Sequence, residues 1–136
     1  MNYFIDTNII IDLLNEQKDA KVKLNEILSD EASEIFINRL VLTEALRMID
    51  FKASNKFKKA EKVLGLFRQV DINPEIYHKA IMFSRFCKSK GTQLKGNCEA
   101  IDFLHFMTAK YYDLTMVTND KDFAKLETAY IEFTSV

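Results

Sequence analysis

Hydrophobic and polar residues alternate along this chain in a pattern that predicts short strands followed by helices. The first strand is predicted over residues 3–5, an apolar run of β-favouring side chains. It stops at Asp6, and residues 6–8 (Asp-Thr-Asn) are all favoured at helix N-termini. Apolar residues then recur at helical spacing over residues 9–14. The chain therefore opens with a buried strand that ends at a carboxylate, and ligands of open α/β sheets bind beyond this end of the strands.

The same patterns divide the rest of the chain into helices and strands. They predict helices over residues 19–28, 39–51, 54–67, 74–90, 99–112 and 121–126, and strands over residues 34–38, 69–72, 114–118 and 130–133. This alternation implies β-α-β crossovers, and therefore an α/β fold with a mainly parallel sheet of about five short strands. Neither a repeat nor a linker interrupts the sequence, so we expect a single domain over residues 1–136.

The composition narrows the class of protein. The 136 residues are 48% hydrophobic and 29% charged, as in a globular domain, and the formal net charge of -1 argues against general electrostatic attraction to nucleic acid or anionic membrane. The two cysteines, Cys87 and Cys98, give no disulfide framework, and no Cys/His cluster has zinc-site spacing. No apolar run approaches the ~20 residues of a membrane span, and the N-terminus lacks the basic region of a signal peptide. We expect a soluble, cytoplasmic protein.

Several carboxylates stand where they can meet. Asp6 and Asp120 each follow an apolar strand, and we expect both strands near the middle of the sheet, where neighbouring strands would bring the two carboxylates to one edge. Glu44 and Asp102 lie within apolar stretches of predicted helices, and buried carboxylates need partners. Apart from Lys121, no Lys or Arg is adjacent to these acids. Mg²⁺ or Mn²⁺, which prefer carboxylate and water oxygens, would resolve the mutual repulsion.

Each of these residues also has a simpler explanation. Asp6 and Asp120 would cap the helices that follow them. Glu44 would be a first-turn charge that complements the helix dipole, and Asp102 would pair with Lys95, Lys110 or another distant base. Taken singly, the simpler explanations are preferred, but taken together at strand ends and on buried helix faces the residues favour a metal site.

These motifs resemble the acidic motifs of PIN-domain ribonucleases. They are Asp6-Thr7-Asn8 after a hydrophobic strand, Thr43-Glu44 on the third helix, Asp102 on a late helix, and Thr118-Asn119-Asp120-Lys121-Asp122-Phe123. The length and the order of elements are most similar to the VapC-type toxins of bacterial and archaeal toxin–antitoxin pairs, over nearly the whole chain. The opening and closing motifs are fairly specific together, whereas either alone is weak.

The resemblance implies a three-layer α/β/α fold with a parallel sheet and metal-dependent cleavage of RNA. It implies that one or two Mg²⁺ or Mn²⁺ ions are held by Asp6, Glu44, Asp102 and Asp120, with Asp122 as a further candidate ligand. An activated water would attack the phosphodiester and leave a 5′-phosphate and a 3′-hydroxyl.

The resemblance also implies supporting residues and partners. Asn8 and Thr118 would support the carboxylates by hydrogen bonds. The chain would form homodimers, and a cognate antitoxin would silence it by placing its tail in the active-site groove. The sequence departs from the family at residues 103–107, which are bulky where small residues are usual after Asp102; the departure bears on the local packing more than on the ligand.

Three lysines are candidates to bind substrate phosphate. Lys88, Lys90 and Lys95 surround the predicted loop before the helix that carries Asp102. A second basic group, at the start of the helix predicted over residues 54–67, forms either an RNA-binding face or a solvated one; its members are Lys56, Lys58, Lys59 and Lys62.

Other residues near the candidate site are assigned simpler roles. Glu99, one turn before Asp102, supports the ligands or faces solvent, and His105, one turn after it, is a core or surface histidine rather than an acid or base. Four phenylalanines are expected in the core or in a dimer interface rather than as base-stacking platforms: Phe51, Phe57, Phe67 and Phe83.

Two other functions compete with the ribonuclease hypothesis. A PIN-like fold without a metal would serve only as a protein–protein interaction module, and alanine at Asp6 would then raise stability by relieving repulsion. A phosphatase or phospho-acceptor domain would use Asp6 as its nucleophile. This second alternative is disfavoured because Asn8 stands where such phosphatases carry a second aspartate.

Overall fold

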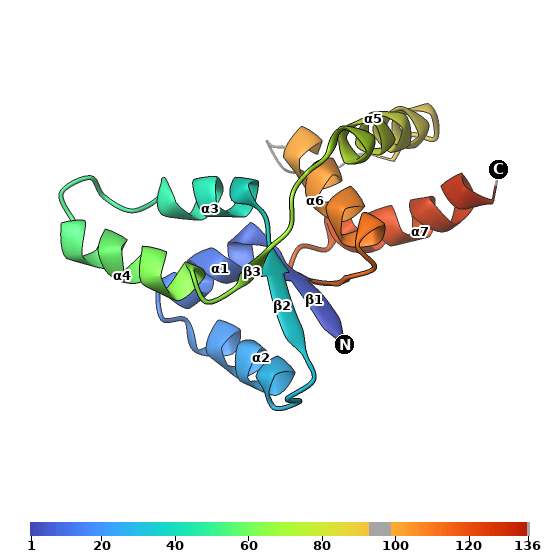
Figure 1. Cartoon of the computed structure of the whole chain (residues 1–136). Helices are drawn as coiled ribbons and strands as arrows, with labels where there is room; N and C mark the ends of the chain where they lie inside the picture. Colours follow the sequence, from blue (N-terminus) through green and yellow to red (C-terminus); the bar gives the residue numbers. More distant parts are fainter. Residues whose placement is uncertain (93–98, 136) are drawn as a thin grey trace. The chain divides into compact units, whose positions relative to one another are not determined.

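The computed structural model describes residues 1–92 and 99–135 of the chain. In this part, four strands form one parallel sheet and seven helices accompany it (Figure 1). The strands are β1 (Asn2–Ile5), β2 (Glu34–Ile37), β3 (Arg68–Gln69) and β4 (Thr115–Val117). The helices are α1 (Thr7–Leu14), α2 (Lys18–Leu28), α3 (Arg39–Leu46), α4 (Ser54–Leu64), α5 (Pro74–Ser89), α6 (Glu99–Tyr111) and α7 (Asp122–Thr134). The predicted α/β class and parallel sheet are confirmed.

The chain divides into two compact units. Unit 1 contains Met1–Asp71 and Leu114–Thr118, and therefore the whole sheet with α1, α2, α3 and α4. Unit 2 contains Ile72–Asp113 and Asn119–Val136, and therefore α5, α6 and α7. Each unit has its own buried apolar side chains.

The sheet of unit 1 has the strand order β3-β2-β1-β4. β1 pairs in parallel on one side with β2, where Phe4 stands opposite Phe36, and on the other with β4, where Ile5 stands opposite Val117. The first strand and the strand before Asp120 are thus neighbours, which the sequence left as a condition. β4, however, is an edge strand of the described sheet, so the expectation that both strands lie near its middle was wrong for β4. A short apolar run does not reveal how many neighbours its strand has.

The helices of unit 1 pack in a series. α1 packs against α2 and α3, and α3 packs against α4. The buried face of α1 carries Ile9 and Ile10, at the spacing that the sequence predicts. Two helices are shorter than predicted: α3 ends at Leu46 rather than near residue 51, and α4 ends at Leu64, directly before Gly65. Apolar residues continue past both ends, so periodicity alone overestimates their length.

α5 in unit 2 begins and ends as its sequence predicts. The side chain of Asn73 accepts a hydrogen bond from the backbone N–H of Ile76, and Pro74 occupies the first turn, where no N–H is needed. At the other end Gly91 adopts φ 75°, and its N–H donates to the carbonyl of Lys88 at 3.2 Å. A glycine in this left-handed conformation closes the helix without a Cβ clash.

The C-terminal segment is a single helix and not the predicted short helix followed by a strand. α7 runs unbroken from Asp122 to Thr134, so the strand predicted over residues 130–133 was wrong. Tyr130 and Phe133, three residues apart, both contact the ring of Phe83, with centroids at 5.5 and 5.2 Å. A helix brings residues at this spacing to one face, whereas a strand would turn them to opposite faces. A four-residue apolar run fits either structure.

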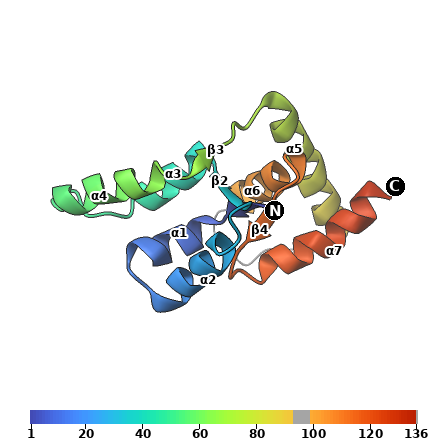
Figure 2. The same ribbon diagram turned by 60° about the horizontal axis from the view of Figure 1, so that its bottom comes forward.

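Phe83 is the centre of an aromatic core in unit 2, where α5 packs against α6 and α7 (Figure 2). Its fully buried ring also contacts Phe103 and Phe106 of α6, with centroids at 5.6 and 5.4 Å. The expectation of a core residue is confirmed for Phe83, whereas Phe51 is 99% exposed and contributes nothing to the core. None of the helices in residues 1–92 and 99–135 is long and apolar enough to cross a membrane.

Candidate functional site

Asp6 lies at the junction of β1 and α1, in unit 1. Its backbone N–H donates to the carbonyl of Val117 on β4 at 3.0 Å, and its own carbonyl accepts from the N–H groups of Ile9 and Ile10. It occupies the N-cap position of α1, yet its side chain makes no capping hydrogen bond. Instead, Oδ2 accepts a 2.9 Å hydrogen bond from the hydroxyl of Thr118, and the residue is only 3% exposed. The capping explanation of Asp6 was therefore wrong, because the carboxylate is held by the end of the neighbouring strand.

Glu44 projects from α3 toward the start of α1. The N-terminus of α3 is capped by Asn38, whose side chain accepts from the N–H of Val41 at 2.9 Å, and no acidic residue lies in its first turn. Glu44 is therefore not the first-turn charge that the simpler explanation required. Its Oε1 accepts a 2.8 Å hydrogen bond from the hydroxyl of Thr7, a buried residue. Since Thr7 directly follows Asp6, the two candidate carboxylates of unit 1 are both connected to the start of α1: Asp6 precedes it, and Glu44 is bound by its first residue.

The remaining acidic candidates belong to unit 2. Asp102 lies in the first turn of α6 and is half-buried, while Glu99 in the same turn is exposed. Lys110, considered as a partner of Asp102, forms its ion pair with Glu127 at 2.7 Å.

The turn before α7 holds two of these acids together. Oδ1 of Asp120 accepts from the backbone N–H of Asp122 at 2.9 Å, and the carbonyl of Asp120 accepts from the N–H of Phe123 at 3.3 Å. The side chain of Asp120 thus satisfies the N–H of the first residue of α7, although the N-cap position itself is Lys121, which makes no side-chain capping hydrogen bond. Asp122 itself is buried and pairs with Lys125 at 3.3 Å.

The donor set is suited to a hard divalent cation. Carboxylate oxygens, with threonine hydroxyls as their hydrogen-bond donors, are the groups that surround Mg²⁺ and Mn²⁺ in proteins. Asp6 and Glu44 lie in unit 1, and Asp102, Asp120 and Asp122 lie in unit 2. Among the described residues, no group of three or more His, Cys, Asp or Glu side chains is arranged to hold a metal ion. The residue types fit the metal, and the ligand set remains a prediction.

Comparison with known proteins identifies the family. The model of the PIN domain matches residues 3–128, which include the motifs at both ends of the chain. The chain belongs to the PIN domain family. No curated protein matches the chain.

Three solved structures share the fold of this PIN domain. The first is the crystal structure of VapBC2 from Rickettsia felis bound to a DNA fragment from their promoter, with a TM-score of 0.77, 23% identity and 93% of each chain covered. The second is a toxin–antitoxin complex from Klebsiella pneumoniae, with a TM-score of 0.71, 23% identity and 90% of each chain covered. The third is FitAcB from Neisseria gonorrhoeae, with a TM-score of 0.72, 22% identity and coverage of 93% of this chain and 94% of that chain.

The predicted supporting and substrate-binding residues of the PIN domain differ in their surroundings. Asn8 lies in the first turn of α1 and is exposed. Lys88 lies in the last turn of α5, and Lys90 at its end pairs with Glu132 at 3.3 Å. Lys95 is outside the described residues.

The prediction for His105 is confirmed, whereas the hydrogen bond of Thr7 does not follow from the sequence pattern. His105 is 1% exposed on α6, which confirms a core histidine. Thr7 was read only as a helix-start residue, whereas its hydroxyl reaches Glu44, 37 residues away. Its position directly after the strand-end aspartate is the one signal in the sequence that pointed to it.

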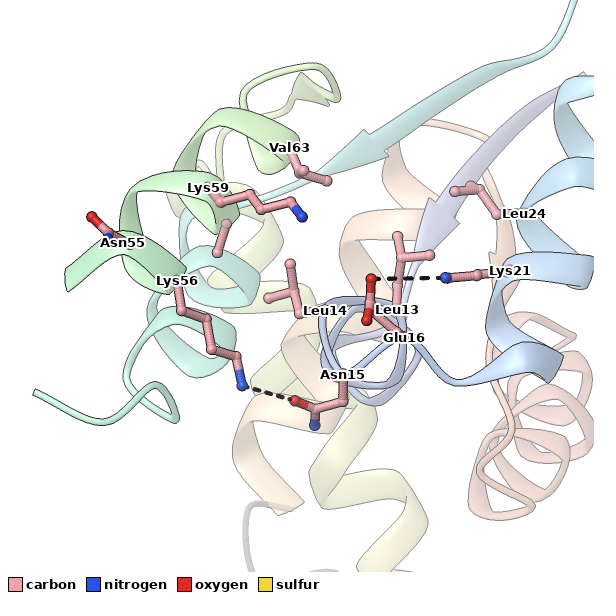
Figure 3. Close-up of a pocket in the computed structure, with 11 residues that line it drawn as sticks. Leu13, Leu14, Asn15, Glu16, Lys21, Leu24, Asn55, Lys56, Lys59 and Val63 are labelled. Carbon is pink, nitrogen blue, oxygen red and sulfur yellow. Dashed lines mark hydrogen bonds and ion pairs between the residues drawn. The ribbon is translucent and has the colours of Figure 1, made fainter. Parts of the chain in front are cut away.

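A groove in unit 1 of the PIN domain was also not foreseen (Figure 3). Its volume is about 680 Å³. It lies between three helices: α2, α4 and the C-terminal end of α1. Its apolar lining consists of Leu13, Leu14, Leu24, Ala60 and Val63. A second hollow of about 400 Å³ shares Leu13, Leu24 and Val63 with it and continues to residues of β2 and β3. Surface hollows lined by apolar side chains are typical of sites where another molecule binds.

Charges line the mouth of the groove. Lys21 reaches Glu16 at 4.0 Å, and Lys56 donates to the side-chain oxygen of Asn15 at 3.4 Å. Figure 3 shows the side chain of Lys59 extending from α4 across the apolar lining. With three lysines and one glutamate among the lining residues, the mouth is net positive.

Proposed function

We propose that this PIN domain is a metal-dependent endoribonuclease and the toxin of a toxin–antitoxin pair. The observation that carries the proposal is the hydrogen bonding of the Asp6 side chain. A buried aspartate stands at a helix N-cap without capping, and its carboxylate is held by Thr118 from the neighbouring strand. A residue with a purely local structural role would satisfy the amides of its own helix.

The proposed ligands of Mg²⁺ or Mn²⁺ are Asp6, Glu44, Asp102 and Asp120, with Asp122 as an additional ligand. Two of them, Asp6 and Glu44, are each bound by one threonine hydroxyl. Each of these hydrogen bonds fixes the orientation of its carboxylate. The chain itself ties Asp120 to this set, because only Asn119 stands between it and Thr118.

The proposed chemistry is hydrolysis of RNA phosphodiesters. A bound divalent ion would supply an activated water at neutral pH and would stabilise the negative charge on the leaving oxygen. Asp6 and Glu44 would hold their carboxylates in fixed orientations through Thr118 and Thr7. Lys88, Lys90 and Lys95 are proposed to attract substrate phosphate. The surface pair of Lys90 with Glu132 is of the weak, exchangeable kind and would open at little cost.

We also propose that the two units act as one functional domain over residues 1–136. The PIN domain match extends over residues 3–128 and so includes the strands of unit 1 and helices of both units. Neither unit alone contains all four proposed carboxylates.

The proposed partner is an antitoxin, whose tail would lie in the active-site groove and a further segment of which would bind in the groove of unit 1. Two of the similar structures bear the names VapBC2 and toxin–antitoxin complex. The apolar lining of the groove suits the apolar face of a partner segment, and its lysines suit acidic residues beside that face. The occupant we propose is therefore an acidic, amphipathic segment of the antitoxin.

We also propose that the chain forms a homodimer. On α5 of unit 2, Ile81 is 57% exposed and Tyr77 is also exposed, and both line a hollow of about 280 Å³ shared with α6. Exposed apolar side chains around a hollow are a surface that a second copy of the chain would cover. Sedimentation equilibrium of the wild type and of Ile81→Lys tests this part: we expect a dimer that the substitution dissociates.

RNA cleavage by the purified protein tests the proposed activity. We expect cleavage of RNA with Mg²⁺ or Mn²⁺ and none with EDTA, and products that carry a 5′-phosphate and a 3′-hydroxyl. Absence of cleavage with every RNA tried, together with a higher unfolding temperature for Asp6→Ala, would favour an interaction module. A phosphorylated aspartate at Asp6 after incubation with a phosphate donor would favour the phosphatase-like function.

A further inference from the structure

Thr7 differs from other threonines of the described helices in where its hydroxyl points. The four others donate to a carbonyl four residues earlier in their own helix: Thr43, Thr108, Thr128 and Thr134. Thr7 is the first residue of α1, and the residue four positions before it, Tyr3, lies in β1. With no carbonyl of its own helix behind it, the hydroxyl is available for a partner elsewhere in the fold.

The partner is a carboxylate on another helix. Thr7 Oγ1 donates to Oε1 of Glu44 at 2.8 Å, and Thr7 is only 6% exposed. α1 packs against α3, and the neighbouring residue Ala45 is buried, so the two ends of the hydrogen bond are carried by packed helices. A hydrogen bond from a buried donor to a charged acceptor is stronger and more directional than one at the surface.

The arrangement at Asp6 is of the same kind. Thr118 Oγ1 donates to Asp6 Oδ2 at 2.9 Å. Thr118 was singled out from the sequence as a support for the carboxylates, whereas Thr7 was not. The structure thus provides a threonine hydroxyl donor for each of the two proposed metal ligands in unit 1, Asp6 and Glu44.

We propose that Thr7 is a positioning residue: its hydroxyl fixes the carboxylate of Glu44 in the orientation in which Glu44 binds the divalent ion. This inference rests on the proposed function, because it concerns the same metal ligand. Thr7 acts only through Glu44 and touches neither the ion nor the RNA. Residues that orient metal ligands in this way typically affect metal affinity by about 10- to 100-fold.

The test measures Mn²⁺ affinity directly, by electron paramagnetic resonance of free Mn²⁺, and so does not depend on activity. Thr7→Val removes the hydroxyl at nearly constant volume, and we expect its Kd for Mn²⁺ to rise about tenfold. Thr7→Ser keeps the donor and is expected to stay close to the wild-type Kd. Thr43→Val is the matched control: it removes a hydroxyl beside Glu44 that donates to the carbonyl of Arg39, and we expect no change.

A double-mutant cycle separates positioning from a general effect on the fold. In a Glu44→Ala background, Thr7→Val should change the Kd for Mn²⁺ much less than in the wild type, because the side chain that accepts its hydrogen bond is gone. If Thr7→Val unfolds, Thr7→Ala is used in its place, since it removes the hydroxyl without forcing a methyl against its neighbours. Thermal unfolding without metal shows which variant is folded.

The outcomes distinguish this inference from the function on which it rests. A wild-type protein that binds Mn²⁺, an Asp6→Asn variant that does not, and a Thr7→Val variant with wild-type affinity would overturn the role of Thr7 alone. An equal loss in Thr7→Val with and without Glu44 would also overturn it. A wild-type protein without Mn²⁺ binding would overturn the proposed function together with this inference.

Discussion

The hydroxyl of Thr118 donates a 2.9 Å hydrogen bond to the carboxylate of Asp6, a residue 112 positions earlier in the chain. The bond exists because β1 and β4 are parallel neighbours, with Ile5 opposite Val117, so that the residue after each strand arrives at the same edge of the sheet. The carboxylate of Asp6 is thereby held in one orientation at this edge. This relationship underlies both the proposed metal site and the first prediction.

Loss of the Thr118 hydroxyl should destabilise the metal-free protein. Thr118→Val leaves the carboxylate of Asp6, which is buried, without this donor, and we expect the free energy of unfolding to fall by about 2 kcal/mol. Urea unfolding in the presence of EDTA measures it. Thr118→Ser keeps the hydroxyl, and its free energy of unfolding should stay close to that of the wild type. Thr115→Val changes an exposed threonine of β4, the strand that precedes Thr118. It should leave the midpoint of urea unfolding nearly unchanged.

Phe83 should be among the most sensitive positions of unit 2. It is fully buried and its ring meets four others, those of Phe103, Phe106, Tyr130 and Phe133. Phe83→Ala removes these contacts and leaves a cavity, so we expect a loss of about 4 kcal/mol in the free energy of unfolding. Phe51→Ala, at a 99% exposed site, should cost less than about 0.5 kcal/mol. Similar losses in the free energy of unfolding from the two variants would contradict the conclusion that Phe83 is the centre of an aromatic core.

These elements show what the sequence could and could not predict. The ends of β1 and β4 were predictable to within a residue, because Asp6 interrupts an apolar run and because polar residues follow the apolar strand that ends at Val117. The α7 helix was not, because its last apolar residues fit a strand or a helix, and contact with Phe83 decides between them. The bond from Thr7 to Glu44 was not predictable either, since it depends on how α1 packs against α3.

The titration of Cys87 gives a prediction for alkaline pH. Burial, together with the negative charge of Glu99, raises the pKa of the Cys87 thiol from its ordinary 9.0 to about 11. The unfolded chain therefore loses this proton at lower pH than the folded protein does. The stability that depends on the neutral thiol is fully present below about pH 9 and is lost as the pH rises toward 11.

Comparison with Cys87→Ala isolates this effect from other groups that titrate at high pH. The difference in the free energy of unfolding between the wild type and Cys87→Ala should shrink by up to about 2 kcal/mol between about pH 8 and about pH 10.5. Urea unfolding at several pH values measures it. A difference that stays constant over this range would show that the thiol titrates at the same pH in both states.

The groove of unit 1 should distinguish acidic from neutral helices. We expect a synthetic amphipathic peptide of about 15 residues, with leucines on one face and glutamates beside them, to bind in a salt-dependent manner. The double substitution Lys56→Glu and Lys59→Glu reverses two charges that line the groove and should weaken binding at least tenfold.

The same helix supplies the control for this measurement. Lys58→Glu and Lys62→Glu make the same change in net charge at exposed positions of α4 that do not line the groove. Fluorescence anisotropy of the labelled peptide with both double variants decides the matter. Equal weakening by the two pairs would show that the peptide responds to overall charge rather than to the groove.

The most direct test of the proposed nuclease is single-turnover RNA cleavage with Mn²⁺ by the wild type, Asp6→Asn and Asp12→Asn. Asp6→Asn keeps the shape of the side chain but removes the charge that would bind the ion, whereas Asp12 lies further along α1 and serves as the matched control. We expect Asp6→Asn to lower the rate by about 100-fold or more and Asp12→Asn to leave it unchanged, with no cleavage by any of the three in EDTA. Cleavage that survives Asp6→Asn at the wild-type rate would contradict the proposal that Asp6 is a metal ligand of this PIN domain.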